Sequence, residues 1–119
     1  MRFSKHNRLL KSTQFDAVFQ SGTKVVSPHF VVVGAQNDAH ARVGLVVSRK
    51  VGSAVTRNRV KRWIRESFRQ SLVNECSLDL VVIARHCSGD IGFRKVQYEL
   101  QQNVIRLSRK FAQSHPTNA

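Results

Sequence analysis

The feature that most constrains the fold is a short and almost uninterrupted apolar run, Leu78–Ala84, with the sequence LDLVVIA. A strand with one face in water alternates polar and apolar residues, and this run does not alternate. It is therefore typical of a strand that is covered on both faces. We expect it to lie in the middle of a sheet, with the rest of the chain arranged around it.

Three other segments have the residue spacing of helices. The segment Ser12–Gln20 carries apolar side chains at helical intervals and stops before Gly22. Thr56 can cap a helix that covers about Arg57–Val73. In the segment Gly92–Phe111, apolar residues recur at steps of three and four, which predicts a long amphipathic closing helix.

Two further segments are predicted to be extended. Lys24–Ala35 is rich in β-branched residues but contains Pro28, which indicates two strand pieces or one strand with a break. Arg42–Val47 is the next extended run, and the polar stretch Gln36–Ala41 turns the chain before it. Across so short a connection, antiparallel pairing of this run with Phe30–Val33 is the simplest arrangement.

These elements follow one another in the order α-β-β-β-α-β-α. The predicted fold class is therefore α/β (α+β), a two-layer sandwich with a small mixed sheet. Its last two strands and the helix between them form a βαβ unit, for which the general expectation is a right-handed crossover. A length of 119 residues suits a single domain, residues 1–119, and we expect the ends 1–8 and 113–119 to be flexible.

The charge of the chain is strongly unbalanced. Lys and Arg number 20 against 7 Asp and Glu, which gives a formal net charge of +13. A small folded domain with so much uncompensated positive charge is expected to bind a polyanion.

Other function classes find little support in the sequence. No apolar stretch approaches the roughly 18 residues of a membrane span, and residues 1–10 lack the apolar core of a signal peptide, so we expect a cytoplasmic protein without a membrane partner. Cys76 and Cys87 form no CxxC pair, which favours free thiols over a zinc site or a disulfide.

The helix after Thr56 has one apolar and one basic face. On a helical wheel the apolar face gathers Val60, Trp63, Ile64, Ser67 and Phe68, and we interpret Trp63 as core. The basic face carries residues at steps of four, three and four, with Lys61 beside them: Asn58, Arg62, Arg65 and Arg69. Such a strip is about 16 Å long and could follow several successive phosphates.

The position of the positive charge within this helix favours phosphate binding over a merely solvated basic face. Arg57, Arg59, Lys61 and Arg62 crowd the first two turns, where the helix dipole is already positive and acidic residues are normally preferred. An anion bound at the helix start would offset both the dipole and the mutual repulsion of these side chains. The preceding loop extends the patch with Arg49, Lys50 and Gly52.

The segment Arg57–Asn58–Arg59, continuing to Arg65, resembles the RNR signature of the protein subunit of bacterial ribonuclease P. The surroundings also resemble that family and cover nearly the whole chain: Arg42 to Leu45, Ser48 to Lys50, Gly52, Ala54, Val55, the Phe15 and Phe19 pair, and Val82 to Arg85. The resemblance is most specific from Arg42 to Arg69.

This resemblance implies the protein component of a ribozyme that removes the 5′ leader from precursor tRNA. The partners would be the catalytic RNA, which holds the catalytic Mg²⁺, and the precursor tRNA, with no cofactor held by the protein and no DNA partner. Contacts to the catalytic RNA are implied for Arg57, Asn58, Arg59, Lys61, Arg62 and Arg65, and the basic strip adds Arg69. A cleft for the leader is implied at Phe15, Phe19, Phe30, Val32, Ser48, Arg49 and Lys50.

The resemblance also modifies two expectations. In that family the βαβ unit has a left-handed crossover, and we follow the family against the general rule. Val33 stands at a sheet position where many members have an aromatic residue, which reduces the stacking expected from this cleft. Without the resemblance, Phe15 and Phe19 would be interpreted as core residues.

Catalysis by the protein itself is not expected. Its carboxylates are scattered without the spacing of a two-metal nuclease, and no pair of histidines is marked as general acid and base. We therefore predict no catalytic and no metal-ligating residue. The alternative function is that of a ribosomal or RNA-chaperone-type binding protein without a role in cleavage, because charge alone does not identify the polyanion.

Overall fold

The apolar run Leu78–Ala84 forms the strand β4, which is one of the two inner strands of a four-stranded sheet with the order β1-β2-β4-β3. The computed structural model describes residues 12–37, 41–70, 78–86 and 88–114. Its elements confirm the expected order: α1 Ser12–Ser21, β1 Thr23–Val26, β2 Phe30–Gln36, β3 Arg42–Val46, the 3₁₀ turn η2 Arg49–Val51, α2 Ala54–Gln70, β4, the 3₁₀ turn η4 Ser88–Asp90 and α3 Phe93–Ser114.

The central strand β4 has a partner on each edge. It pairs antiparallel with β2, where Val82 lies opposite Val32, and parallel with β3, where Val82 lies opposite Leu45. The expected break near Pro28 is confirmed, because β1 and β2 are separate strands that pair antiparallel. The sheet is therefore mixed, and β3, α2 and β4 form a βαβ unit with parallel strands.

The expected direct pairing of the Arg42–Val47 run with Phe30–Val33 is wrong. β2 and β3 do run antiparallel to each other, but β4 lies between them. The physical reason is the composition of β4, since an apolar strand in the interior also needs both of its backbone edges hydrogen-bonded. Neighbouring strands are about 4.8 Å apart. The connection between β2 and β3 therefore spans about 4.8 Å more across β4 than it would if the two strands were paired directly.

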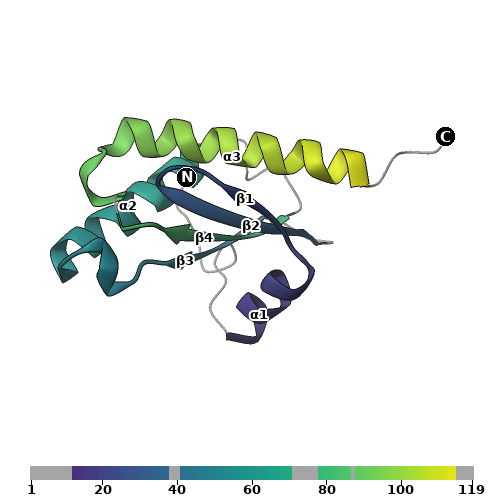
Figure 1. The fold of residues 1–119 in the computed structure, drawn as a ribbon, viewed down its shortest axis with the longest axis horizontal. Coiled ribbons are helices and arrows are strands. Elements are labelled where there is room, and N and C mark those ends of the chain that lie inside the picture. Colours follow the sequence, from purple (N-terminus) through teal and green to yellow (C-terminus); the bar gives the residue numbers. More distant parts are fainter. Residues whose placement is uncertain (1–11, 38–40, 71–77, 87, 115–119) are drawn as a thin grey trace.

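Helices cover both faces of the sheet (Figure 1), so the elements form three layers and the expected two-layer sandwich is wrong. The helices α2 and α3 lie on one face, and α1 lies on the other. The larger core cluster joins α2 and α3 to the sheet through Phe30, Ile64, Phe68, Leu80 and Leu100, all at most 1% exposed. The smaller cluster lies under α1 and is built on Val18, Val33 and Val81. None of the helices in the described ranges is long and apolar enough to cross a membrane.

The ends of the helices differ slightly from expectation. The first turn of α2 is capped by Ser53 and not by Thr56: the Ser53 hydroxyl accepts the N–H of Thr56 at 3.3 Å, and its carbonyl accepts the N–H of Arg57 at 2.9 Å. With Ser53 as the cap, α2 begins at Ala54 and is three residues longer at its start than the predicted helix. The expected end of α2 at Val73 lies outside the described residues, as do 1–8 and 115–119, while α3 continues through residues 113 and 114.

The outer edge of β1 is closed by side chains of α3. Arg106 donates from Nη1 to the carbonyl of Val26, and Lys110 donates from Nζ to the carbonyl of Lys24, both at 3.2 Å. These carbonyls face away from β2, on the side where a further strand could pair. The amphipathic helix α3 thus covers the sheet with its apolar face and its edge with two basic side chains.

A polar network ties the middle of α3 to the turn between β1 and β2. The Glu99 carboxylate accepts hydrogen bonds from the Ser27 hydroxyl at 2.5 Å and from the His29 backbone N–H at 2.9 Å, and it contacts His29 Nδ1 at 2.7 Å. Asn103, 1% exposed, donates to the Ser27 hydroxyl at 3.0 Å. Burial alone would raise the pKa of Glu99, but the hydrogen bonds from Ser27 and His29 outweigh it and hold the pKa below its ordinary value.

This network predicts an acid-sensitive contribution to stability. A carboxyl whose pKa is lower in the folded chain stabilises the fold above its unfolded pKa, about 4.5, and this contribution is lost as the pH falls through the folded pKa. Glu99→Gln should therefore be less stable than the wild type at pH 7, and the difference should shrink as the pH falls below about 4.5. Urea unfolding at several pH values measures this, and a constant difference across the pH range would contradict it.

Candidate nucleic-acid interface

The basic strip on α2 points away from the core. Val60, Ile64 and Phe68 are at most 1% exposed and form the buried face of the helix, and Trp63 is half-buried beside them. The opposite face carries the exposed residues of the predicted strip, with Lys61 half-buried at its side: Asn58, Arg62, Arg65 and Arg69. The predicted division of this helix into an apolar and a basic face is confirmed. At its far end Arg69 forms an ion pair with Glu66.

The first turns of α2 concentrate cations beside the positive end of the helix dipole. No acidic residue stands in the first turn. Arg57 and Arg59 are half-buried there, and in each the Nε atom is buried without a hydrogen-bond partner among the described residues. Buried guanidinium N–H groups are normally paired, so these two Nε donors are left unsatisfied by the described part of the chain.

Arg59 is positioned by two contacts. Its Nη2 donates to the carbonyl of Gly89 at 3.2 Å, and its guanidinium carbon lies 5.4 Å from the centre of the Trp63 ring, within the range of a cation–π interaction. Trp63 therefore does more than fill the core, because its ring fixes a cation at the edge of the strip. From the sequence, Trp63 was assigned to the core alone. The spacing of four residues between Arg59 and Trp63 on one helix could have indicated the contact.

The turn η4 fits closely against the start of α2. Gly89 is buried, and a Cβ atom at this position would lie 2.7 Å from Thr56 Cγ2. Neighbouring Ser88 is fully buried, and its hydroxyl has no hydrogen-bond partner in the described part of the chain. The small size of Gly89 thus brings η4 near enough for its carbonyl to hold Arg59.

The basic loop before α2 has a defined conformation. The Ser48 hydroxyl accepts the N–H of Lys50 at 3.3 Å and caps η2, and Gly52 has a φ of +150°, which side chains rarely allow. Arg49 and Lys50 are exposed on this turn. Because the turn leads directly into α2, its two cations continue the basic strip.

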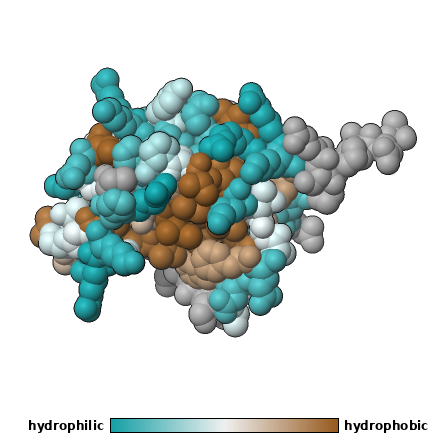
Figure 2. All heavy atoms as spheres, viewed as in Figure 1, coloured by the Kyte–Doolittle hydropathy of each residue, from teal (hydrophilic) through white to brown (hydrophobic). Residues whose placement is uncertain are grey.

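The opposite face of the sheet carries a partly buried apolar surface beside α1. Val18 of α1 packs on Val33 and Val81, while several apolar side chains around them stay only partly buried: Phe15, Val31, Ala35, Val46 and Ile83. In Figure 2, hydrophobic residues form a band across the middle of the molecule, where Figure 1 places the sheet, and hydrophilic residues border it. We call the apolar patch of Phe15, Val31, Val46 and Ile83 the α1 surface.

The structure does not bring all the predicted leader-contacting residues to this surface. Phe30 and Val32 are 0% exposed and belong to the core under α2 and α3, on the other face of the sheet. Their neighbour Val31 faces α1 instead, because successive side chains of a strand point to opposite faces. Sequence reasoning missed Val31, Val46 and Ile83, and assigning the alternate residues of each strand to the α1 face could have identified them.

Phe15, Phe19 and the basic loop lie where they can border the α1 surface. Phe15 is half-buried in the smaller core cluster, and Phe19 is 45% exposed. β3 carries Val46 in this surface and leads two residues later to Ser48, Arg49 and Lys50, all exposed. The α1 surface is therefore apolar along the sheet and basic at the end of β3, a combination that suits unpaired bases and their phosphates.

Among the described residues no group of three or more His, Cys, Asp and Glu could hold a metal ion. Three of the carboxylates are engaged in ion pairs, Asp79 with Arg42, Glu66 with Arg69 and Glu99 with His29. The Arg42 pair is bidentate, and the Asp79 hydrogen bond raises the pKa of Arg42 above its ordinary value despite burial.

Gly89 provides a test of how η4 positions the strip. Gly89→Ala should lower the free energy of unfolding by about 1–3 kcal/mol, because the new methyl group overlaps Thr56 Cγ2. Adding Thr56→Ser, which removes that Cγ2, should restore most of the loss, whereas Thr56→Ser alone should change little. Denaturant unfolding of the three variants measures this, and an equal loss in the single and double variants would contradict the assigned contact.

Comparisons with known proteins agree in their result. The sequence model of the family described as ribonuclease P matches residues 3–108. The ribonuclease P protein component of Staphylococcus epidermidis is 37% identical over 109 residues, which cover 90% of this chain and 94% of that protein. That of Pseudomonas putida is 40% identical over 120 residues, covering 98% of this chain and 87% of the relative.

A solved structure has the same fold. The structure of a Staphylococcus aureus RNase P protein mutant with defective mRNA degradation activity superposes with a TM-score of 0.79 at 33% sequence identity. The match covers 86% of this chain and 88% of the other.

Proposed function

Since this chain belongs to the bacterial ribonuclease P protein family, and is thus a subunit of an endoribonuclease, we propose that it holds the catalytic RNA and the 5′ leader of precursor tRNA together. The RNA subunit would contact the basic strip on α2 and the start of that helix. The leader would lie on the α1 surface, between Phe15 and the basic loop. The whole chain would act as one RNA-binding domain in the cytoplasm.

The observation that carries this proposal is the arrangement of charge on α2. Arg62 has no carboxylate partner among the residues that the structure describes, and the buried Nε atoms of Arg57 and Arg59 have no acceptor there. Arg57 lies at the end of the first turn of α2, beside the positive end of the helix dipole, and Arg59 and Arg62 follow in the next two turns. A phosphate backbone supplies acceptors for the guanidinium groups and relieves the repulsion between them.

The proposed mechanism is electrostatic and positional. The protein supplies no nucleophile and no metal ligand, and the Mg²⁺ ions that cleave the leader would be held by the catalytic RNA. By neutralising phosphates where RNA subunit and leader converge, the protein would lower the Mg²⁺ concentration that cleavage requires. The left-handed βαβ crossover expected from the family belongs to the same proposal, since it places the start of α2 relative to the α1 surface.

The experiment that tests this function is reconstitution. The full chain, combined with a bacterial catalytic RNA, should increase leader removal from precursor tRNA at low Mg²⁺, while the protein alone should cleave nothing. If it gave no increase but bound ribosomal RNA tightly, the alternative of a ribosomal or chaperone-type protein would replace the proposal.

The strip predicts a specific salt dependence. Arg62→Ala with Arg65→Ala should weaken binding to the catalytic RNA and make the plot of log K against log salt shallower by about 1 for each phosphate that is no longer neutralised. Filter binding at several salt concentrations measures the slope. The matched control is Arg109→Ala with Lys24→Ala, which removes the same charge from exposed side chains of α3 and β1. Equal slopes for both double variants would contradict the assigned strip.

The α1 surface predicts a difference between substrates. Phe15→Ala should weaken binding of precursor tRNA by about 1–3 kcal/mol, the worth of one base stacked on an aromatic ring, and leave mature tRNA unchanged because it lacks the leader. Phe19→Ala tests the other ring in the same assay. Ile105→Ala, which truncates a side chain 43% exposed on α3, is the control. With folding verified by circular dichroism, equal losses for both tRNAs would make Phe15 a core residue only.

A further inference from the structure

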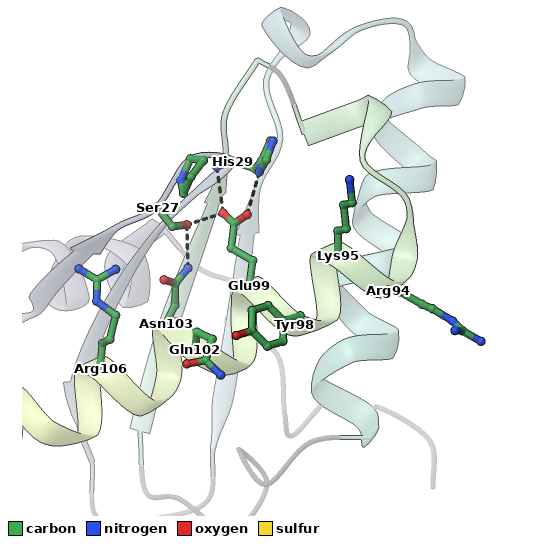
Figure 3. A pocket seen from close by; sticks show the side chains of 10 residues that line it. Ser27, His29, Arg94, Lys95, Tyr98, Glu99, Gln102, Asn103 and Arg106 are labelled. Carbon is green, nitrogen blue, oxygen red and sulfur yellow. Dashed lines mark hydrogen bonds and ion pairs between the residues drawn. The ribbon is translucent and has the colours of Figure 1, made fainter.

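A pocket on the opposite side of the sheet from α1 belongs to neither the strip nor the α1 surface. It is an open hollow of about 490 Å³ between α3 and the turn from β1 to β2. Figure 3 shows Glu99 and Asn103 pointing from α3 toward Ser27 and His29, with Tyr98 and Gln102 beside them on the same helix. Arg106 stands toward one end of the pocket, and Arg94 and Lys95 stand toward the other.

The floor of the pocket is held in place by the chain itself. The Glu99 carboxylate accepts from the Ser27 hydroxyl and from the His29 backbone N–H, and Asn103 donates to the same hydroxyl. Glu99 is the only carboxylate among the lining residues, and its side chain is 15% exposed. Its oxygens are directed inward at Ser27 and His29, away from the basic side chains at the two ends of the pocket.

The rim of the pocket is basic. Within the described ranges, Arg94, Lys95 and Arg106 form no ion pair. Arg106 uses one N–H for the carbonyl of Val26, and a guanidinium has five N–H donors in all, so most of them remain available. Arg94 and Arg106 are twelve residues apart on α3, or about 18 Å along its axis. A chain with successive phosphates matches that spacing better than one small anion does.

An aromatic ring lies between these cations. Tyr98 is 66% exposed, and Arg94, Tyr98, Gln102 and Arg106 follow one another along α3 at steps of four. Cations on both sides of an exposed ring are the elements that bind single-stranded nucleic acid, where bases stack on rings and phosphates meet the basic side chains. A double helix offers no free base for the ring, so the arrangement favours an unpaired segment.

We propose that this pocket is a further RNA site, which seats an unpaired segment of a few nucleotides with one base on Tyr98 and phosphates along the segment at Arg94 and Arg106. Gln102 lies where its amide can hydrogen-bond the edge of the stacked base. The site shares no residue with the basic strip or the α1 surface, so it adds a contact to the proposed function. The complex would then hold RNA at α3 as well as at α2.

The composition of the chain allows the two sites to be followed separately. Tyr98 is the only tyrosine and Trp63 the only tryptophan, and Trp63 lies under Arg59 at the strip. We would titrate the full chain with penta-adenylate and with penta-uridylate and record aromatic proton–carbon NMR spectra. Stacking of a base should move the Tyr98 ring signals upfield, more strongly with adenine, and phosphate binding at the strip should move the Trp63 signals.

Variants then test the roles of the ring and the rim. In a background of Arg62→Ala with Arg65→Ala, Tyr98→Leu should reduce affinity for penta-adenylate about five-fold or more, the loss of one stacked base, whereas Tyr98→Phe should retain it. Arg106→Gln should weaken binding, while Arg109→Gln on the neighbouring turn should weaken it less. Tyr98 is largely exposed, so these changes leave the core intact, and thermal unfolding verifies this.

Each outcome decides one of the proposals. Trp63 signals that move while the Tyr98 signals stay would overturn the pocket and leave the strip in place. Tyr98 signals that move while the Trp63 signals stay would support the pocket and count against the strip. Equal affinities of Tyr98→Leu and Tyr98→Phe would show that the ring does not stack, and the pocket would then be a solvated hollow or a docking site for another class of partner.

Discussion

The burial of β4 on both faces is the constraint on which the rest of the structure depends. Leu80, Val81 and Val82 are each 0% exposed, and they pack alternately toward α2 and α3 or toward α1. Helices must therefore stand on both sides of the sheet, and each side is left with a different surface. One side presents the strip on α2 and the pocket on α3, and the other presents the α1 surface. Separate basic and apolar surfaces on the two sides of the sheet follow from how one strand is covered.

Much of this architecture could be predicted from the sequence, because it rests on local patterns. The helical spacing of α2 and α3, the break at Pro28 and the central place of β4 are properties of short segments. The pairing of β2 with β3 was mispredicted because strand order depends on which strands compete for β4, and no short segment records that competition. Thr56 was mistaken for the cap of α2 because Ser53 stands only three residues earlier and satisfies the same preference.

The binding surfaces were predictable to different degrees. The strip follows from helix geometry, because successive residues of a helix are rotated by about 100° around its axis. The exposed position of its side chains could therefore be predicted. The α1 surface depends on which face of each strand turns toward α1, and a shift of one residue exchanges Val31 for Val32. The pocket on α3 brings residues from positions 27–29 together with residues from positions 94–106, and only the folded chain joins these segments.

The closure of the β1 edge has a consequence for the protein before it meets RNA. A free strand edge is a template on which a second molecule can add its own strand, and small sheets are prone to such self-association. Arg106 and Lys110 occupy the carbonyls of Val26 and Lys24 and set positive charge along that edge. Two copies that approached each other along this edge would meet with like charge, which disfavours strand addition at β1.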